Sequence, residues 1–236
     1  MESQIFGETV VFWVGRIPVT ATMVTSLAIS LTLVGVALAL RVGLKRSPTR
    51  MPAALALLTV EWLDRLVRDV AGRAEPALVT LAGSLFLFIA ACNLCGQLPG
   101  VRPPTASLAT TSALAAIVFF AVPVAGIRAR GLRGYLLGYF RPNPLFAPLH
   151  VISEFSRTLA LSMRLFGNMM GGESLLAVFM GLGVGLLAFS NLPVGIPLHL
   201  PFIFLELLTT LVQALVFTLL STIYISLVLP HSEEAH

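Results

Sequence analysis

The chain of 236 residues is 57% hydrophobic and only 11% charged, whereas about 25% of the residues of an ordinary soluble domain are charged. With a mean hydropathy of +0.93, so much apolar surface cannot be hidden inside a water-soluble globule, which excludes a soluble enzyme, a disordered chain and a disulfide scaffold. The net charge of +4 would suit nucleic acid, but in a membrane protein such an excess more often reflects the orientation of the loops.

Five apolar segments are long enough to cross a bilayer, which takes about 20 residues of helix. The first three crossings are expected at 17–40, 76–98 and 104–127, and two longer helices at 144–189 and 196–229. Because a vertical crossing does not need so many residues, the last two helices should be tilted. A short turn joins them, so they should form an antiparallel hairpin. The sequence therefore predicts a single all-α polytopic membrane domain over 1–236.

Residues 52–73 have a different character from the five crossings. Apolar residues recur there at helical spacing, while acidic and basic residues take the other side; the apolar set is Leu55, Leu58, Trp62, Leu66 and Val70. This pattern predicts an amphipathic helix that lies in the membrane interface rather than crossing it.

The basic residues outside the apolar helices predict the orientation of the chain. Eleven of them fall within 41–73 and 128–141, and only Arg16 and Arg102 lie on the opposite side. Since loops rich in Lys and Arg stay in the cytoplasm, we expect the N-terminus outside and the C-terminus inside. The excess of positive charge then needs no nucleic acid. Cys92 and Cys95 lie in an apolar run without a second ligand pair, so we expect packing there and no metal site.

Two basic and three acidic residues remain inside apolar helical sequence: Glu154, Arg157, Arg164, Glu173 and Glu206. An ionisable side chain in the membrane costs at least about 2.5 kcal/mol, so each marks a candidate functional site. Glu154 and Arg157 lie near the inner surface and can pair with each other across three residues, which favours a structural role for these two.

Arg164 lies deeper and has no acid within one helical turn. Gly167, Asn168 and Gly171 share its face of the helix, and such small residues form a shallow groove into which another helix can pack. Simple packing of two helices explains the glycines equally well.

In an antiparallel hairpin, Arg164 should lie level with Gln213, which shares a polar face with Thr210, and Glu173 should lie level with Glu206. The two acids would line a wet path from the outer surface, together with Ser190, Asn191 and His199. The arginine, which is always charged, would block straight passage of cations. Such a chain would conduct the ion only from the outer surface to the arginine. A mobile partner would have to carry the ion past the arginine.

The stretch from Ser153 to Glu173 contains Arg-Leu-Phe-Gly-Asn-Met and resembles the signature of the a subunit of F-type ATP synthases. The run from Leu211 to Tyr224 is similar to the last helix of that family. The resemblance implies that Arg164 is the stator arginine facing a ring of c subunits, that Asn168 and Gln213 lie near it, and that Glu173 and Glu206 line the outer channel. It further implies b subunits of the peripheral stalk, the remaining synthase subunits and membrane lipid as partners, the bacterial inner membrane as location, and no cofactor.

Some positions depart from the pattern of that family. Both outer-channel positions are Glu, and Thr158 replaces the usual Pro after Arg157, which resembles an atypical branch and leaves both protons and sodium open as the ion. No phosphate-binding G-x-x-x-x-G-K-[ST] loop occurs, so ATP chemistry belongs to other subunits. Two alternatives stay open: a secondary transporter that works alone, although no internal repeat is visible, and a scaffold whose buried charges merely pair.

Overall fold

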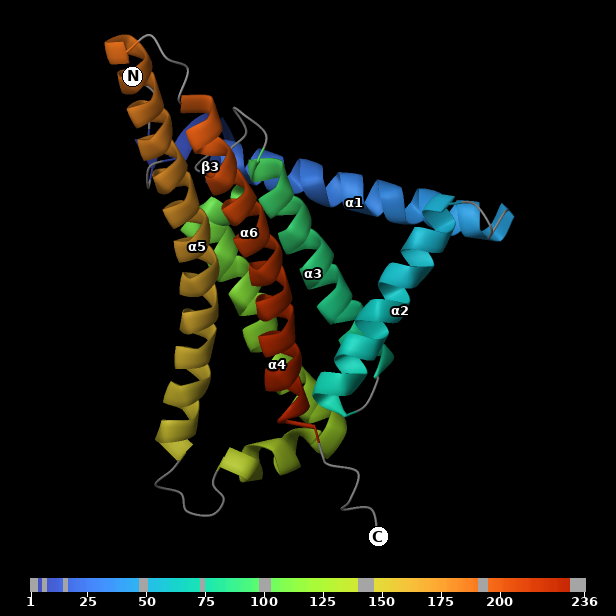
Figure 1. Ribbon diagram of the computed structural model, residues 1–236. Coiled ribbons are helices and arrows are strands. Elements are labelled where there is room, and N and C mark those ends of the chain that lie inside the picture. Colours follow the sequence, from blue (N-terminus) through green and yellow to red (C-terminus); the bar gives the residue numbers. More distant parts are fainter. Residues whose placement is uncertain are drawn as a thin grey trace. The chain divides into compact units, whose positions relative to one another are not determined.

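The computed structural model describes residues 4–5, 8–14, 17–46, 51–72, 75–97, 103–139, 147–190 and 195–229. In this part of the chain there are six α-helices (Figure 1): α1 (Ala21–Arg46), α2 (Met51–Ala71), α3 (Pro76–Gly96), α4 (Leu108–Tyr139), α5 (Ala147–Ser190) and α6 (Gly195–Ser226). All except α2 are long and apolar enough to cross a membrane. The predicted class, a helical polytopic membrane protein, is confirmed.

A small antiparallel sheet precedes the helices, and the sequence analysis did not anticipate it. Its strands β1 (Gln4–Ile5), β2 (Glu8–Val14) and β3 (Ile17–Thr20) follow one another in chain order. The run of β-branched and aromatic residues in β2 suits a strand, and Pro18 lies in the edge strand β3, where a missing N–H is tolerated. The helix expected from residue 17 therefore begins at Ala21.

Two helices extend beyond the C-terminal ends expected for them. The helix α1 continues to Arg46, and α4, which follows the 3₁₀ turn η1 (Pro104–Ala106), continues past residue 127. Gly131 interrupts α4 with φ of 74° and ψ of 161°, a conformation that glycine adopts far more readily than other residues. The label α4 thus covers two helical segments that meet at this glycine.

The chain divides into two compact units, although the apolar pattern suggests a single domain. The first unit comprises Met1–Leu33, Leu87–Thr111 and Met163–Leu215, and the second comprises Val34–Phe86, Ser112–Ser162 and Val216–His236. Each is described below by itself.

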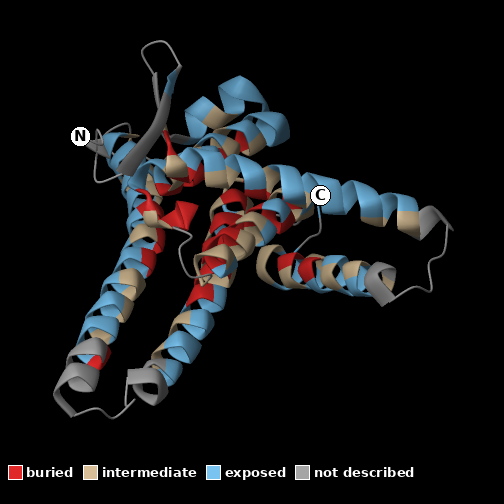
Figure 2. Ribbon diagram, turned by 90° about the horizontal axis from the view of Figure 1, so that it is seen from above, coloured by how far each residue is buried: buried red, intermediate tan, exposed pale blue. Residues whose placement is uncertain are grey.

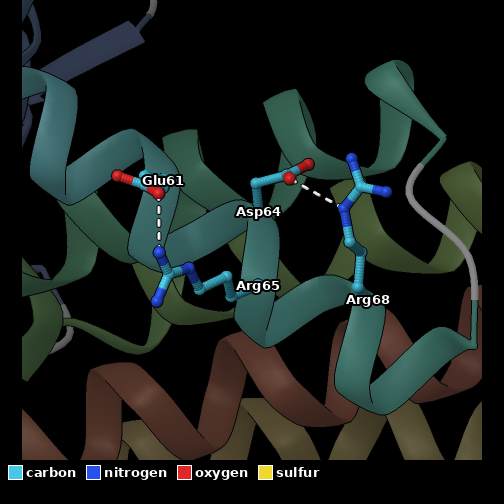
Figure 3. A network of polar contacts seen from close by, with 4 residues as sticks. All are labelled: Glu61, Asp64, Arg65 and Arg68. Carbon is cyan, nitrogen blue, oxygen red and sulfur yellow. Dashed lines mark hydrogen bonds and ion pairs between the residues drawn. The ribbon is translucent and has the colours of Figure 1, made fainter.

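The second unit is held together by a hydrophobic cluster from α2, α3, α4 and α6. Its buried members are Val67, Leu78, Ala82, Val122, Ile225 and Leu229. From α2, Leu63 and Val67 are buried, whereas Leu55 and Leu58 on the predicted apolar side are exposed. The charged side of α2 carries two ion pairs one turn apart (Figure 3), with Arg65 Nη2 2.6 Å from Glu61 Oε1 and Arg68 Nε 2.8 Å from Asp64 Oδ2.

Burial differs strongly among the membrane-spanning helices. Figure 2 shows α1 and α5 exposed along most of their length, whereas buried residues are frequent on α3, α4 and α6. The exposed side chains include Leu27, Leu31 and Val178, which suit contact with lipid or with another membrane protein.

Candidate functional site

In the first unit, α5 and α6 form an antiparallel pair (Figure 1). Four contacts define their register: the stacked rings of Phe179 and Phe202, the close approach of Gly172 to Glu206, the 4.0 Å contact of Met169 Sδ with Thr210 Oγ1, and the 2.7 Å hydrogen bond of Asn168 with Gln213. In these contacts the residue numbers fall along α5 while they rise along α6, so the two helices run in opposite directions.

The contact of Gly172 with Glu206 agrees with the register expected there, but the partner of Gln213 on α5 lies one helical turn from the expected one. This amide was expected level with Arg164, but its Oε1 accepts a hydrogen bond from Nδ2 of Asn168, four residues further along α5. Gln213 is 4% exposed, and its Nε2 has no hydrogen-bond partner within the described part of the chain.

A cavity of about 300 Å³ lies between α5 and α6. Its polar lining comes from Asn168, Glu206, Thr209, Thr210 and Gln213, and its remaining walls include three glycines of α5. Buried polar atoms without a partner among the described residues include Glu206 Oε2 and Gln213 Nε2. A cavity of this size has room for water molecules, which would satisfy such atoms.

The carboxyl group of Glu206 is the point on which several elements converge. Gly172 lies opposite it, where an added Cβ would lie 3.0 Å from Glu206 Oε1. The side chains of Gln97 and Glu173 lie near enough to Glu206 to act on it electrostatically. The carboxyl group of Glu206 is thus accompanied by an amide from the end of α3, and the carboxyl group of Glu173 acts on it electrostatically.

Asn93, Gln97 and Thr105 were missed by the sequence analysis. Thr105 Oγ1 donates a 2.6 Å hydrogen bond to Asn93 Oδ1, and Asn93 Nδ2 donates to the carbonyl of Thr210 at 3.3 Å. Asn93 and Thr105 are fully buried, and their bonds tie α3 and η1 to α6. A lone amide within an apolar span was the available signal, because a buried polar group needs a partner.

Arg164 lies on an open face of α5. It is exposed, as are Gly167 and Gly171 on the same face, and an added Cβ at either glycine would meet no atom within 4 Å. No hydrogen bond or ion pair joins the arginine to another residue that the structure describes. Within these residues, the glycines do not serve to pack another helix of this chain.

The remaining predicted residues lie elsewhere. Glu154 and Arg157 line a cavity of the second unit, and the guanidinium of Arg157 lies 5.7 Å from the centre of the Tyr224 ring. Asn191 and the side chains of Ser190 and His199 lie outside the described residues. No group of three or more His, Cys, Asp and Glu residues that could hold a metal ion occurs in the described ranges.

The fold and the site define a polytopic helical membrane protein in which carboxyl and amide groups meet between two spans, next to one exposed arginine. A family model described as ATP synthase A chain matches residues 15–226, so the chain belongs to this family. ATP synthase subunit a 1 of Chlorobium luteolum is 39% identical over 231 residues, which are 93% of this chain and 95% of the relative. ATP synthase subunit a of Albidiferax ferrireducens is 38% identical over 230 residues, 93% of this chain and 91% of the relative.

Proposed function

We propose that the chain is the ion-translocating stator subunit of the membrane sector of an F-type ATP synthase. In this role it guides protons or sodium ions to and from a ring of c subunits, and the flow turns the ring. The family match and the names of the relatives support this role. The chain itself performs no ATP chemistry.

The observation that carries the proposal is the exposed Arg164 on α5. A charged group in the middle of an apolar membrane helix is costly unless an opposite charge or water meets it. Gly167 and Gly171 leave the approach to the arginine open, so a helix bearing a carboxylate can come close. We assign that helix to the c subunit, whose carboxylate releases its ion when it passes Arg164.

The ion path has two offset halves. The outer half runs past Glu173 and Glu206 through the cavity between α5 and α6, where Asn168 and Gln213 supply further polar atoms. The inner half leaves on the cytoplasmic side of Arg164. One charge that crosses a potential of 100 mV releases about 2.3 kcal/mol, which is the work available for each step of the ring.

The assembly and location follow the same reasoning. Because the distribution of Lys and Arg favours an N-terminus outside and a C-terminus inside, the chain is oriented in the bacterial inner membrane with most of its basic loops in the cytoplasm. Its further partners are the b subunits of the peripheral stalk, the other synthase subunits and the surrounding lipid.

Reconstitution tests the role directly. Liposomes that hold the complete synthase should make ATP when an ion gradient is imposed, while liposomes that hold this chain alone should show no ion flux above that of empty vesicles. A gradient of protons and a gradient of sodium, imposed separately, identify the ion. Flux through the chain alone, at the rate of the assembled complex, would instead support a transporter that works by itself.

A further inference from the structure

Gln97, which directly follows α3, has a side-chain amide to which the proposed ion path gives no role. Its Nε2 atom is buried and has no hydrogen-bond partner among the described residues. The same holds for Oε2 of Glu206, the carboxyl group on the outer half of the path. A donor and an acceptor are therefore both buried and unpaired, and each costs free energy until it finds a partner.

The contact between α3 and α6 places these two groups at the same level. Asn93 Nδ2 donates a hydrogen bond of 3.3 Å to the carbonyl of Thr210. Gln97 follows one helical turn after Asn93, and Glu206 precedes Thr210 by one turn. The side chain of Gln97 acts on the carboxyl group of Glu206, as expected where the two helices run in opposite directions. The amide of Gln97 is thus the donor that α3 brings to Glu206.

The backbone at the end of α3 is held in place on two sides. Asn93 accepts a hydrogen bond of 2.6 Å from the hydroxyl of Thr105. Gly96 lets Pro103 come close, because a Cβ added at Gly96 would lie 2.7 Å from the Cβ of Pro103. Since the backbone is held, rotation about the side-chain bonds of Gln97 is the movement that brings its amide to an acceptor.

We propose that Gln97 is a positioning residue for Glu206, and that its Nε2 donates a hydrogen bond to Oε2 when the carboxylate has given up its ion. The inference rests on the proposed function, in which the ion passes Glu206. A hydrogen bond to a charged carboxylate is stronger than one to a neutral group, so Gln97 favours the ion-free carboxylate and speeds the transfer of the ion toward the rotor.

The other buried donor without a partner in the described part of this site is Nε2 of Gln213. Gln213 lies seven residues beyond Glu206, which corresponds to about 10 Å along the helix. This distance is too long for a direct hydrogen bond from Gln213 to the carboxyl group. Gln97 is therefore the better placed of the two amides.

The test measures ATP synthesis by the complete synthase in liposomes, over a range of ion concentrations on the outer side. Gln97→Met removes the donor and keeps a side chain of similar length. The maximal rate should fall about tenfold, as expected for the loss of a hydrogen bond to a charged group. The ion concentration that gives half of the maximal rate should fall too, because the ion stays longer on a carboxylate that has lost its donor.

Two further variants separate this role from a structural one. Gln97→Asn keeps an amide on a shorter side chain, so it should lose less activity than Gln97→Met. Thr80→Val is the matched control, because it removes a polar group from an exposed position of the same helix and should change neither quantity. The amount of assembled complex in the liposomes is measured for each variant.

Four results would overturn the proposal. These are an unchanged rate in Gln97→Met, a lower maximal rate with an unchanged half-maximal concentration, an equal loss in Gln97→Asn, and failure of the Gln97→Met complex to assemble. Each of them concerns Gln97 alone. The proposed function would fail by a different result, namely no ATP synthesis by the unchanged complex under the ion gradient.

Discussion

Glu206 and Arg164 meet opposite surroundings, although both are ionisable residues of membrane-spanning helices. The carboxyl group of Glu206 is half-buried beside Gly172, near Gln97 and Glu173. The guanidinium of Arg164 belongs to an exposed residue next to Gly167 and Gly171, where an added Cβ would meet no described atom within 4 Å. The surroundings of Glu206 suit a group that exchanges an ion with enclosed water. The surroundings of Arg164 suit a group that binds a partner from outside the chain.

Gly172 sets the position of the Glu206 carboxyl group. Gly172→Ala would place a Cβ 3.0 Å from Oε1, so the carboxylate must shift by a few tenths of an ångström. We expect ion-driven ATP synthesis by the assembled complex to fall as a result. Gly181→Ala is the control, because an added Cβ at this exposed position of α5 meets no atom within 4 Å. Equal activity of the two variants would show that the carboxylate does not need its present position.

Asn93 contributes to stability through two buried hydrogen bonds. Asn93→Leu removes the partners of the Thr105 hydroxyl and the Thr210 carbonyl, and burying unpaired groups should lower the free energy of unfolding by about 1–3 kcal/mol. Thermal unfolding of the chain in detergent measures the loss. The neighbouring Leu94 is 49% exposed, so Leu94→Ala should change stability by less than about 0.5 kcal/mol. A similar loss in both variants would contradict the account.

At the scale of the element, the two sides of α2 contribute unequally to stability. Its ion pairs are exposed (Figure 3), and such pairs one turn apart contribute about 0.3–0.5 kcal/mol each. Glu61→Gln should therefore have a small effect on thermal unfolding. Val67 is 1% exposed within the cluster of the second unit, so Val67→Ala should destabilise by at least about 1 kcal/mol. The reverse order would show that charge rather than packing holds this helix.

The register of α5 and α6 can be tested by crosslinking. In a chain whose Cys92 and Cys95 are replaced by Ser, cysteines at 168 and 213 should form a disulfide on mild oxidation, because the side chains of these residues are in direct contact. A cysteine pair at 164 and 213 should react much more weakly, since position 164 lies one turn away. Preferential reaction of the second pair would restore the register expected from the sequence alone.

The helices of this protein were predictable because the hydrocarbon of a membrane offers no hydrogen-bond partner to the backbone N–H and C=O groups, which must therefore bond to one another. The approach of α5 to Glu206 at Gly172 also followed from spacing along two helices joined by a short turn. The contacts of Asn93 and Thr105 were not predictable, because no periodicity tells which turn of α3 meets α6. The sheet before α1 and the break at Gly131 were not predicted either. At both places the backbone preferences of a few residues determine the structure, whereas the apolar pattern alone suggested one continuous helix.

At the scale of the whole molecule, the long exposed surface of α5 is the feature that calls for a partner. Much of that surface is apolar, with residues such as Met163, Met170 and Val178 exposed, and Arg164 and the open glycines interrupt it. Lipid suits the apolar part but gives the guanidinium no countercharge. The proposed rotor subunit, with an apolar helix and one carboxylate, would satisfy both parts of this surface.

The central claim is that the positive charge of Arg164 couples ion flow to the movement of that rotor. The most direct measurement is ATP synthesis driven by an imposed ion gradient, in liposomes that hold the complete synthase with Arg164→Ala, next to the same complex with Arg128→Ala. The account predicts that the first complex assembles but makes no ATP, while the second retains its rate. ATP synthesis at the unchanged rate in the Arg164→Ala complex would contradict it.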